Sequence, residues 1–163
     1  MSNEEEERQV IVCKMPDGKV AIVVPAEGVP VEDCASHVPP EALSHRVCST
    51  ADMPQDRNFR DAWTDDAKII NGITGDVEDS PTVDVDMPKA REIHKEHLRR
   101  KRKPELAELD ILALMAIEEA DSKMLAIVRE AKRELRDCTD DPNIALAKTP
   151  EELKECSPAL LKP

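Results

Sequence analysis

Two cysteines and two histidines between residues 34 and 48 have the spacing of a metal-binding loop, C-x2-H-x7-H-x2-C. The four candidate ligands are Cys34, His37, His45 and Cys48. Ligand pairs at both ends of a loop suit tetrahedral zinc, because each pair delivers two ligands from one turn. The loop is shorter than in common zinc modules, however, and it contains Pro39 and Pro40. We therefore interpret the four residues as ordinary side chains of a polar loop. A zinc site and a Cys34–Cys48 disulfide are the competing interpretations.

The other side chains that could do chemistry form no recognisable active site. His94 and His97 lie one helical step apart and could grip a metal jointly, but their charged neighbours favour solvated surface histidines. No serine or cysteine lies in a nucleophile-elbow sequence, and none of the four glycines belongs to a phosphate-binding loop. We therefore expect a non-enzymatic protein without a resident cofactor.

The composition predicts a small hydrophobic core. The 163 residues include one Phe, one Trp and no Tyr, although aromatic side chains usually supply much of the buried area. Thirteen prolines, most of them before residue 90, argue against a compact N-terminal half. We expect an α+β chain that is extended rather than globular, and that gains order from partners or from copies of itself.

The charge is distributed unevenly along the chain. The net charge is −12, and all of it falls in residues 1–86, whereas residues 87–163 are neutral overall. A basic segment in the second half contains Arg99, Arg100, Lys101, Arg102 and Lys103. We expect this segment to meet an acidic surface, such as the acidic linker of a neighbouring copy. Nucleic-acid binding is disfavoured, because stacking aromatics are missing and the rest of the chain is acidic.

The first half predicts a β-hairpin followed by irregular structure. Apolar runs at residues 9–15 and 19–24 flank Pro-Asp-Gly, which is a turn sequence. We also predict a helical turn at 40–43 and a short strand at 45–48. Phe59 and Trp63 lie four residues apart, and we expect them to fill a local mini-core, to anchor the N-terminal segment and to serve as interaction residues.

The second half predicts an antiparallel helical hairpin over residues 87–138. Its seam is predicted to contain Leu106, Leu109, Ala113, Ala116, Ala120, Met124, Val128, Ala131, Leu135 and Cys138. Pro104 should kink or split the first helix. Apolar side chains off the seam would form a second, interacting surface. These side chains are Ile111, Leu112, Met115 and Ile127. Asp121–Ser122 can break the chain and cap the second helix. Asp141–Pro142 and Thr149–Pro150 are cap-proline sequences that predict two short helices near 142–147 and 150–156, with Glu152 placed to reach back to the Thr149 N–H.

These elements give a predicted division of the chain into five parts. They are an acidic tail (1–8), a hairpin-containing module (9–63), an acidic linker (64–86), the helical hairpin (87–138), and short C-terminal helices with a tail (139–163). No run of 18 apolar residues predicts a membrane span, and the acidic start does not resemble a signal peptide. We expect synthesis in a host cytoplasm.

Three phrases of the sequence resemble a group of small tailed-bacteriophage proteins encoded among the tail and tail-fibre genes. They are VVPAEG after the hairpin, ADMPQDRNFRDAW at 51–63, and the run that begins VDMPKAREIHKEHLRRKRKPELAELD. The second half is also similar to phage tail assembly chaperones.

The resemblance implies a structural or adaptor protein of the virion, bound to other phage structural proteins or to copies of itself. An assembly chaperone absent from the particle is the first alternative. A small zinc- or nucleic-acid-binding regulator is the second.

Overall fold

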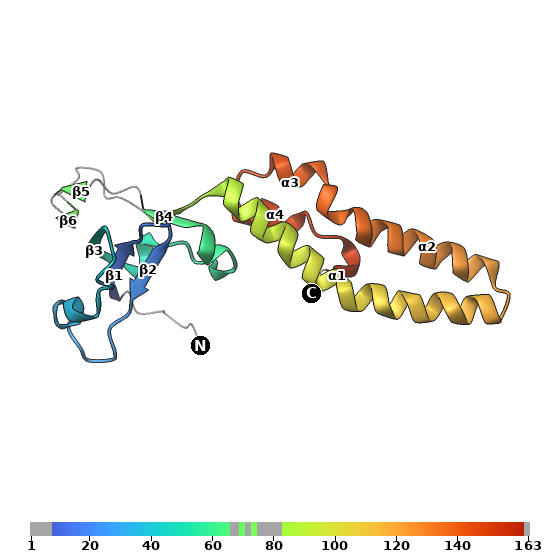
Figure 1. Cartoon of the computed structure of the whole chain (residues 1–163), viewed down its shortest axis with the longest axis horizontal. Helices are drawn as coiled ribbons and strands as arrows, with labels where there is room; N and C mark the ends of the chain where they lie inside the picture. The colour runs from blue at the N-terminus through green and yellow to red at the C-terminus, as the bar shows by residue number, and fades with distance from the viewer. Residues whose placement is uncertain (1–7, 66–68, 71–72, 75–82, 162–163) are drawn as a thin grey trace. The chain divides into compact units, whose positions relative to one another are not determined.

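The computed structural model describes residues 8–65, 69–70, 73–74 and 83–161, and the fold is α+β (Figure 1). The chain forms two compact units, residues 1–86 and residues 87–163. The first is built on small sheets and the second on helices. The predicted acidic tail lies outside the described residues except for Arg8.

The predicted β-hairpin is confirmed. Strands β1 (Gln9–Lys14) and β2 (Val20–Val23) pair antiparallel, with Ile11 opposite Val23. In the turn, the Met15 N–H donates to the Lys19 carbonyl at 2.9 Å. Gly18 has φ +77°, a left-handed conformation that glycine adopts without a steric penalty. The Pro-Asp-Gly sequence therefore sets the register of the hairpin locally.

Strand β1 lies between β2 and β3 in a five-stranded sheet with the order β2-β1-β3-β6-β5. β3 (Ser44–Ser49) confirms the strand predicted at 45–48 and pairs antiparallel with β1. β6 (Ile73–Thr74) runs parallel to β3, and β5 (Ile69–Ile70) pairs antiparallel with β6. Because successive side chains of β1 point to opposite faces, its apolar run is buried on both.

The two faces of β1 carry separate clusters. Ile11 and Cys13 pack with the 3₁₀-helix η1 (Val31–His37), which the sequence reasoning missed. The helical turn predicted at 40–43 is instead a simple turn, closed by a hydrogen bond from the Ala42 N–H to the Pro39 carbonyl at 3.0 Å. Residues 31–42 therefore cover one face of the sheet with a 3₁₀-helix and a turn, and contain no α-helix.

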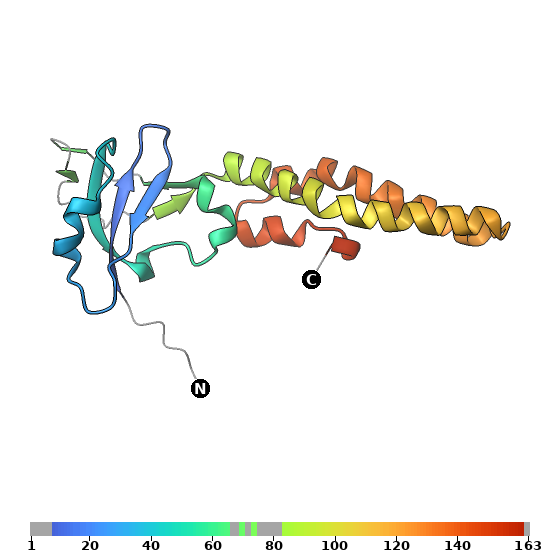
Figure 2. The same ribbon diagram turned by 60° about the horizontal axis from the view of Figure 1, so that its bottom comes forward.

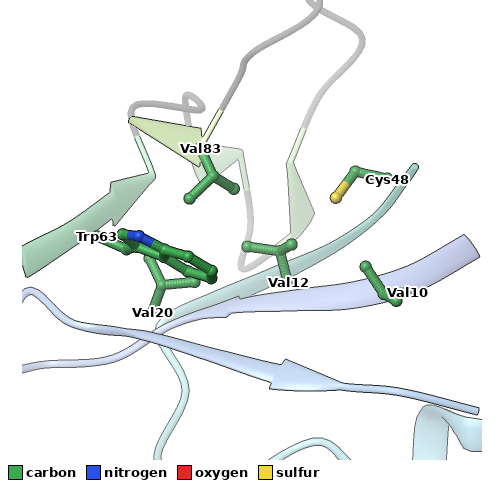
Figure 3. Packing of buried hydrophobic residues seen from close by; sticks show 6 residues of the cluster. All are labelled: Val10, Val12, Val20, Cys48, Trp63 and Val83. Carbon is green, nitrogen blue, oxygen red and sulfur yellow. The ribbon is translucent and has the colours of Figure 1, made fainter. Parts of the chain in front are cut away.

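The opposite face of β1 holds the cluster around Trp63. Val12 and Val20 lie close to its indole ring, and Val10 lies farther along β1 beside Cys48, as Figure 3 shows. Short 3₁₀-helices η2 (Thr50–Asp52) and η3 (Arg57–Ala62) lead to β4 (Trp63–Asp65), which pairs with β7 (Val83–Val85). Both ends of the predicted linker therefore belong to a small sheet. The rest of that linker lies largely outside the described residues.

The first helix of the second unit is not split at Pro104, which corrects that half of the prediction. α1 (Met87–Glu118) is one helix of 32 residues that contains this proline. Proline removes a single backbone hydrogen bond. Pro104 is exposed, and so is Arg100, whose carbonyl loses its helical donor. Packing of other elements along α1 therefore outweighs the local defect.

The remaining elements confirm the predicted caps. α2 (Ser122–Asp137) returns beside α1 after Ala120 and Asp121, as Figures 1 and 2 both show. It is followed by η4 (Cys138–Asp140), α3 (Pro142–Leu146), α4 (Pro150–Glu155) and η5 (Ala159–Leu161). Thr149 Oγ1 accepts from the Glu152 N–H at 3.3 Å. Glu152 itself accepts from the Lys148 N–H rather than the expected Thr149 N–H.

Candidate functional site

The α1–α2 hairpin is held by a sharp turn and a narrow seam. Ala120 has φ +56°, and Asp121 Oδ1 accepts from the N–H groups of Lys123 and Met124, both at 3.0 Å. This cap satisfies two of the donors that a helix N-terminus leaves unpaired. Of the predicted seam residues, Ala116, Val128, Leu135 and Cys138 are buried. Ala120 and Met124 are exposed, because the turn lies beyond the overlap of the two helices.

The outer side of α1 is apolar and uncovered. Between Leu109 and Ile117 the only charged residue is Asp110, which pairs with Lys132 of α2 at 2.6 Å. A helix that is apolar all round is normally buried all round, yet α2 covers only one face here. The exposed apolar side chains of the hairpin are Ile111 (60%), Leu112 (42%), Leu114 (62%), Met115 (49%), Ile117 (59%), Met124 (42%) and Ile127 (65%).

Four of these exposed residues were predicted as a second surface, and two were missed. Ile111, Leu112, Met115 and Ile127 are exposed as expected. Leu114 and Ile117 were not singled out from the sequence. The absence of any charge from residue 111 to residue 117 was the signal that could have identified them.

The basic segment divides between the surface and the interior of the second unit. Arg100, Lys101 and Lys103 are exposed, which leaves them accessible to an acidic partner. Arg99 Nη1 lies 3.2 Å from Glu96 Oε2 in an exposed pair on the same helix. Such surface pairs contribute little to stability.

Arg102 corrects the expectation that the whole basic segment faces a partner. Its Nη1 donates to the backbone carbonyls of Leu135 at 3.3 Å and Arg136 at 2.7 Å. These carbonyls belong to the last turn of α2, where a helix leaves acceptors unpaired and carries partial negative charge. Arg102 therefore caps α2 within its own chain.

Phe59 and Trp63 also correct the expectation of an interaction role. Both are buried, with exposed fractions of 1% and 2%. Trp63 belongs to the core cluster of the first unit, together with residues of the five-stranded sheet and of β7. An intermolecular contact is unavailable to side chains that the chain's own core already covers.

The cysteine–histidine pattern does not assemble in space. Cys34 packs in the cluster with Ile11 and Cys13, whereas Cys48 packs with Val10 on the opposite face of the sheet. Alternation along β1 separates these clusters, so one ion cannot contact both sulfurs, and a disulfide between them is equally precluded. Within the described ranges, no three His, Cys, Asp or Glu side chains are grouped to hold a metal ion.

Thiol reactivity tests this arrangement. Burial raises the pKa of Cys13, Cys48 and Cys138, and Cys34 is also buried. Burial and nearby carboxylates raise the pKa of Cys156 as well, so exposure decides which thiol reacts first. Iodoacetamide at pH 7.5 should alkylate Cys156 first, because it is half-exposed and the other four cysteines are buried. Non-reducing peptide mapping should recover Cys34 and Cys48 unlinked. A joined Cys34–Cys48 peptide from freshly purified protein would contradict the opposite-face assignment.

His94 is an inward-facing group of α1 rather than a solvated surface histidine. It is 5% exposed. Burial lowers its pKa, and the nearby positive charges of His97 and Lys101 lower it further. Burial likewise lowers the pKa of His97, which is half-buried. The fold therefore holds His94 as a neutral imidazole.

Acid should destabilise the second unit through His94. The unfolded chain binds a proton at about pH 6.5, whereas the folded chain binds it only at lower pH, so stability falls as pH drops below about 6.5. Urea unfolding monitored by helical circular dichroism should give a lower midpoint at pH 5 than at pH 7. His94→Gln should reduce this difference, and the exposed control His37→Gln should preserve it. An unchanged pH dependence in His94→Gln would refute the assignment.

An ion pair that sequence reasoning missed joins β3 to β4. Arg46 donates through Nε and Nη2 to the carboxylate of Asp65 at 3.2–3.3 Å, and the two side chains are 9% and 1% exposed. Lys14 Nζ donates to the Asp65 backbone carbonyl at 2.8 Å. Nineteen residues separate the paired charges, and Asp65 is one of many acidic residues in its region, so no local pattern marked it.

Comparisons with protein-family models, with curated proteins and with solved structures found no match for this chain. Among the described residues, no helix combines the length and apolar character that a membrane crossing needs.

Proposed function

We propose that this protein is a non-enzymatic structural or adaptor component of a tailed-bacteriophage particle, docked at or near the tail and its fibres. The observation that carries the docking role is the uncovered apolar side of α1 around Ile111 and Leu114. Exposed apolar area on this scale is characteristic of an interaction surface. The resemblance of residues 51–63 to phage proteins supports the particle as the setting.

The residues of the second unit suit a binding role. Arg102, Asp110 and Asp121 all serve as caps or pairs that fix the α1–α2 hairpin. A rigid hairpin presents its outer side chains with little loss of conformational freedom on binding, which favours affinity. The exposed cations Lys101 and Lys103 flank the apolar side and could select an acidic neighbour.

Mass spectrometry of purified, washed phage particles tests the proposal. The chain should be present at a fixed ratio to known tail proteins. A phage carrying Ile111→Asp should yield particles with less of the chain, whereas Leu146→Asp, which changes an equally exposed apolar residue on α3, should not. Presence in infected-cell lysate but absence from washed particles would reject the structural role and favour the assembly chaperone.

A further inference from the structure

The exposed side of α1 has a repeat that reads the same in both directions. The stripe consists of Pro104, Ala107, Ile111, Met115 and Glu118, all exposed, with successive steps of three, four, four and three residues. These steps place the residues on one face of the helix. The pattern is symmetric about Ile111, so the face can meet its own copy in the reverse direction.

We infer that the outer face of α1 binds a second copy of this chain, with the two α1 helices antiparallel and crossing at Ile111. A twofold axis at that point places Ile111 against its counterpart and Ala107 of each copy opposite Met115 of the other. Such a twofold contact is isologous and closes at two copies. This dimer deepens the proposed function, and it rests on that proposal only in assuming that the exposed apolar side of α1 is a binding surface.

The centre of the face is apolar. Ile111 and Met115 lie on it and Leu114 lies at its edge, all three exposed. Leu112 and Ile117 lie about 100° and about 120° around the helix from Ile111, on opposite flanks. A second helix packed over Ile111 would therefore cover Ile111, Met115 and Leu114.

The twofold rotation also brings opposite charges together beside the face. α1 is basic before Pro104 and acidic towards its end. An antiparallel crossing at Ile111 places Lys103 of one copy near Glu118 of the other, and Lys101 near Glu119. All four are exposed, and within the described part of the chain none makes an ion pair. A parallel arrangement would instead set like charges against each other.

Sedimentation velocity and light scattering of the full-length protein test the dimer. The expected mass is twice 18.2 kDa at micromolar concentration. Ile111→Asp should raise the dissociation constant roughly 100-fold or more, because it places two carboxylates at the centre of the interface. Leu146→Asp, also an exposed apolar residue of the second unit, should leave the dissociation constant unchanged. Circular dichroism verifies that both variants are folded.

Charge reversal tests the antiparallel pairing specifically. Lys103→Glu alone and Glu118→Lys alone should each weaken self-association, because each sets two pairs of like charges together. An equimolar mixture of these two variants should form a mixed dimer, and the double variant Lys103→Glu/Glu118→Lys should dimerise like the natural chain. A mixture that stays monomeric would overturn the antiparallel geometry.

The outcomes separate this inference from the proposed function. A chain that is monomeric at 100 µM, a closed trimer, or a dimer indifferent to Ile111→Asp would each overturn the inference. If such a chain is still found in washed particles, the structural role stands and the α1 face serves a different virion protein. A dimer absent from particles would preserve the inference and reject the role.

Discussion

Arg46→Met is expected to lower the free energy of unfolding of the first unit by about 3–5 kcal/mol. The substitution would leave the Asp65 carboxylate, 1% exposed, without the guanidinium that neutralises it. Removal of one partner from a buried ion pair is strongly destabilising, because water does not replace the interaction that the remaining charge loses. The loss is a large part of the stability of a unit of this size.

The fluorescence of Trp63 during urea unfolding provides the measurement, since it is the only tryptophan and lies in the core of the first unit. Arg60→Met removes an exposed arginine and should change stability by less than about 0.5 kcal/mol. The double variant Arg46→Met/Asp65→Leu should recover most of the loss, because it removes both charges. If Arg46→Met unfolds at the same urea concentration as Arg60→Met, the ion pair has no structural role.

Trp63→Ala should destabilise the same unit by about 3–5 kcal/mol, since it leaves a large cavity among Val12, Val20 and Val83. Figure 3 shows Val12 and Val20 of the five-stranded sheet on one side of the indole ring and Val83, from the strand β7 that pairs with β4, on the other. The expected consequence is loss of the packing between the five-stranded sheet and the β4–β7 pair. Hydrogen exchange of the β1 amides in the full-length chain reports this opening.

Trp63→Phe is the informative companion variant. It keeps much of the ring volume and removes the indole N–H, which is buried without a hydrogen-bond partner within the described structure. Removing an unsatisfied donor offsets part of the lost contact, so Phe should cost much less than Ala. Val47→Ala on β3 trims a half-exposed side chain and serves as the control. Equal exchange rates in Trp63→Ala and Val47→Ala would show that Trp63 does not organise this core.

The sequence determined the features that depend on near neighbours in the chain. Pro-Asp-Gly specified the first hairpin, because the left-handed conformation of Gly18 is a local preference. Asp121 and Thr149 marked helix starts, since each cap bonds to an N–H two or three residues away. Apolar spacing identified much of the α1–α2 seam, because helical periodicity alone places Ala116, Val128 and Leu135 on facing stripes.

The tertiary structure decided which side chains meet across the chain. The strand alternation of β1 sent Cys34 and Cys48 to opposite faces, so a promising ligand spacing became two unrelated core residues. Arg46 and Asp65 are brought together by strands that are distant in sequence. Proline at 104 was tolerated because packing along the whole of α1 outweighs one lost hydrogen bond. Sequence showed that Ile111 is apolar, but only the fold shows that it remains uncovered, because burial depends on every element packed nearby.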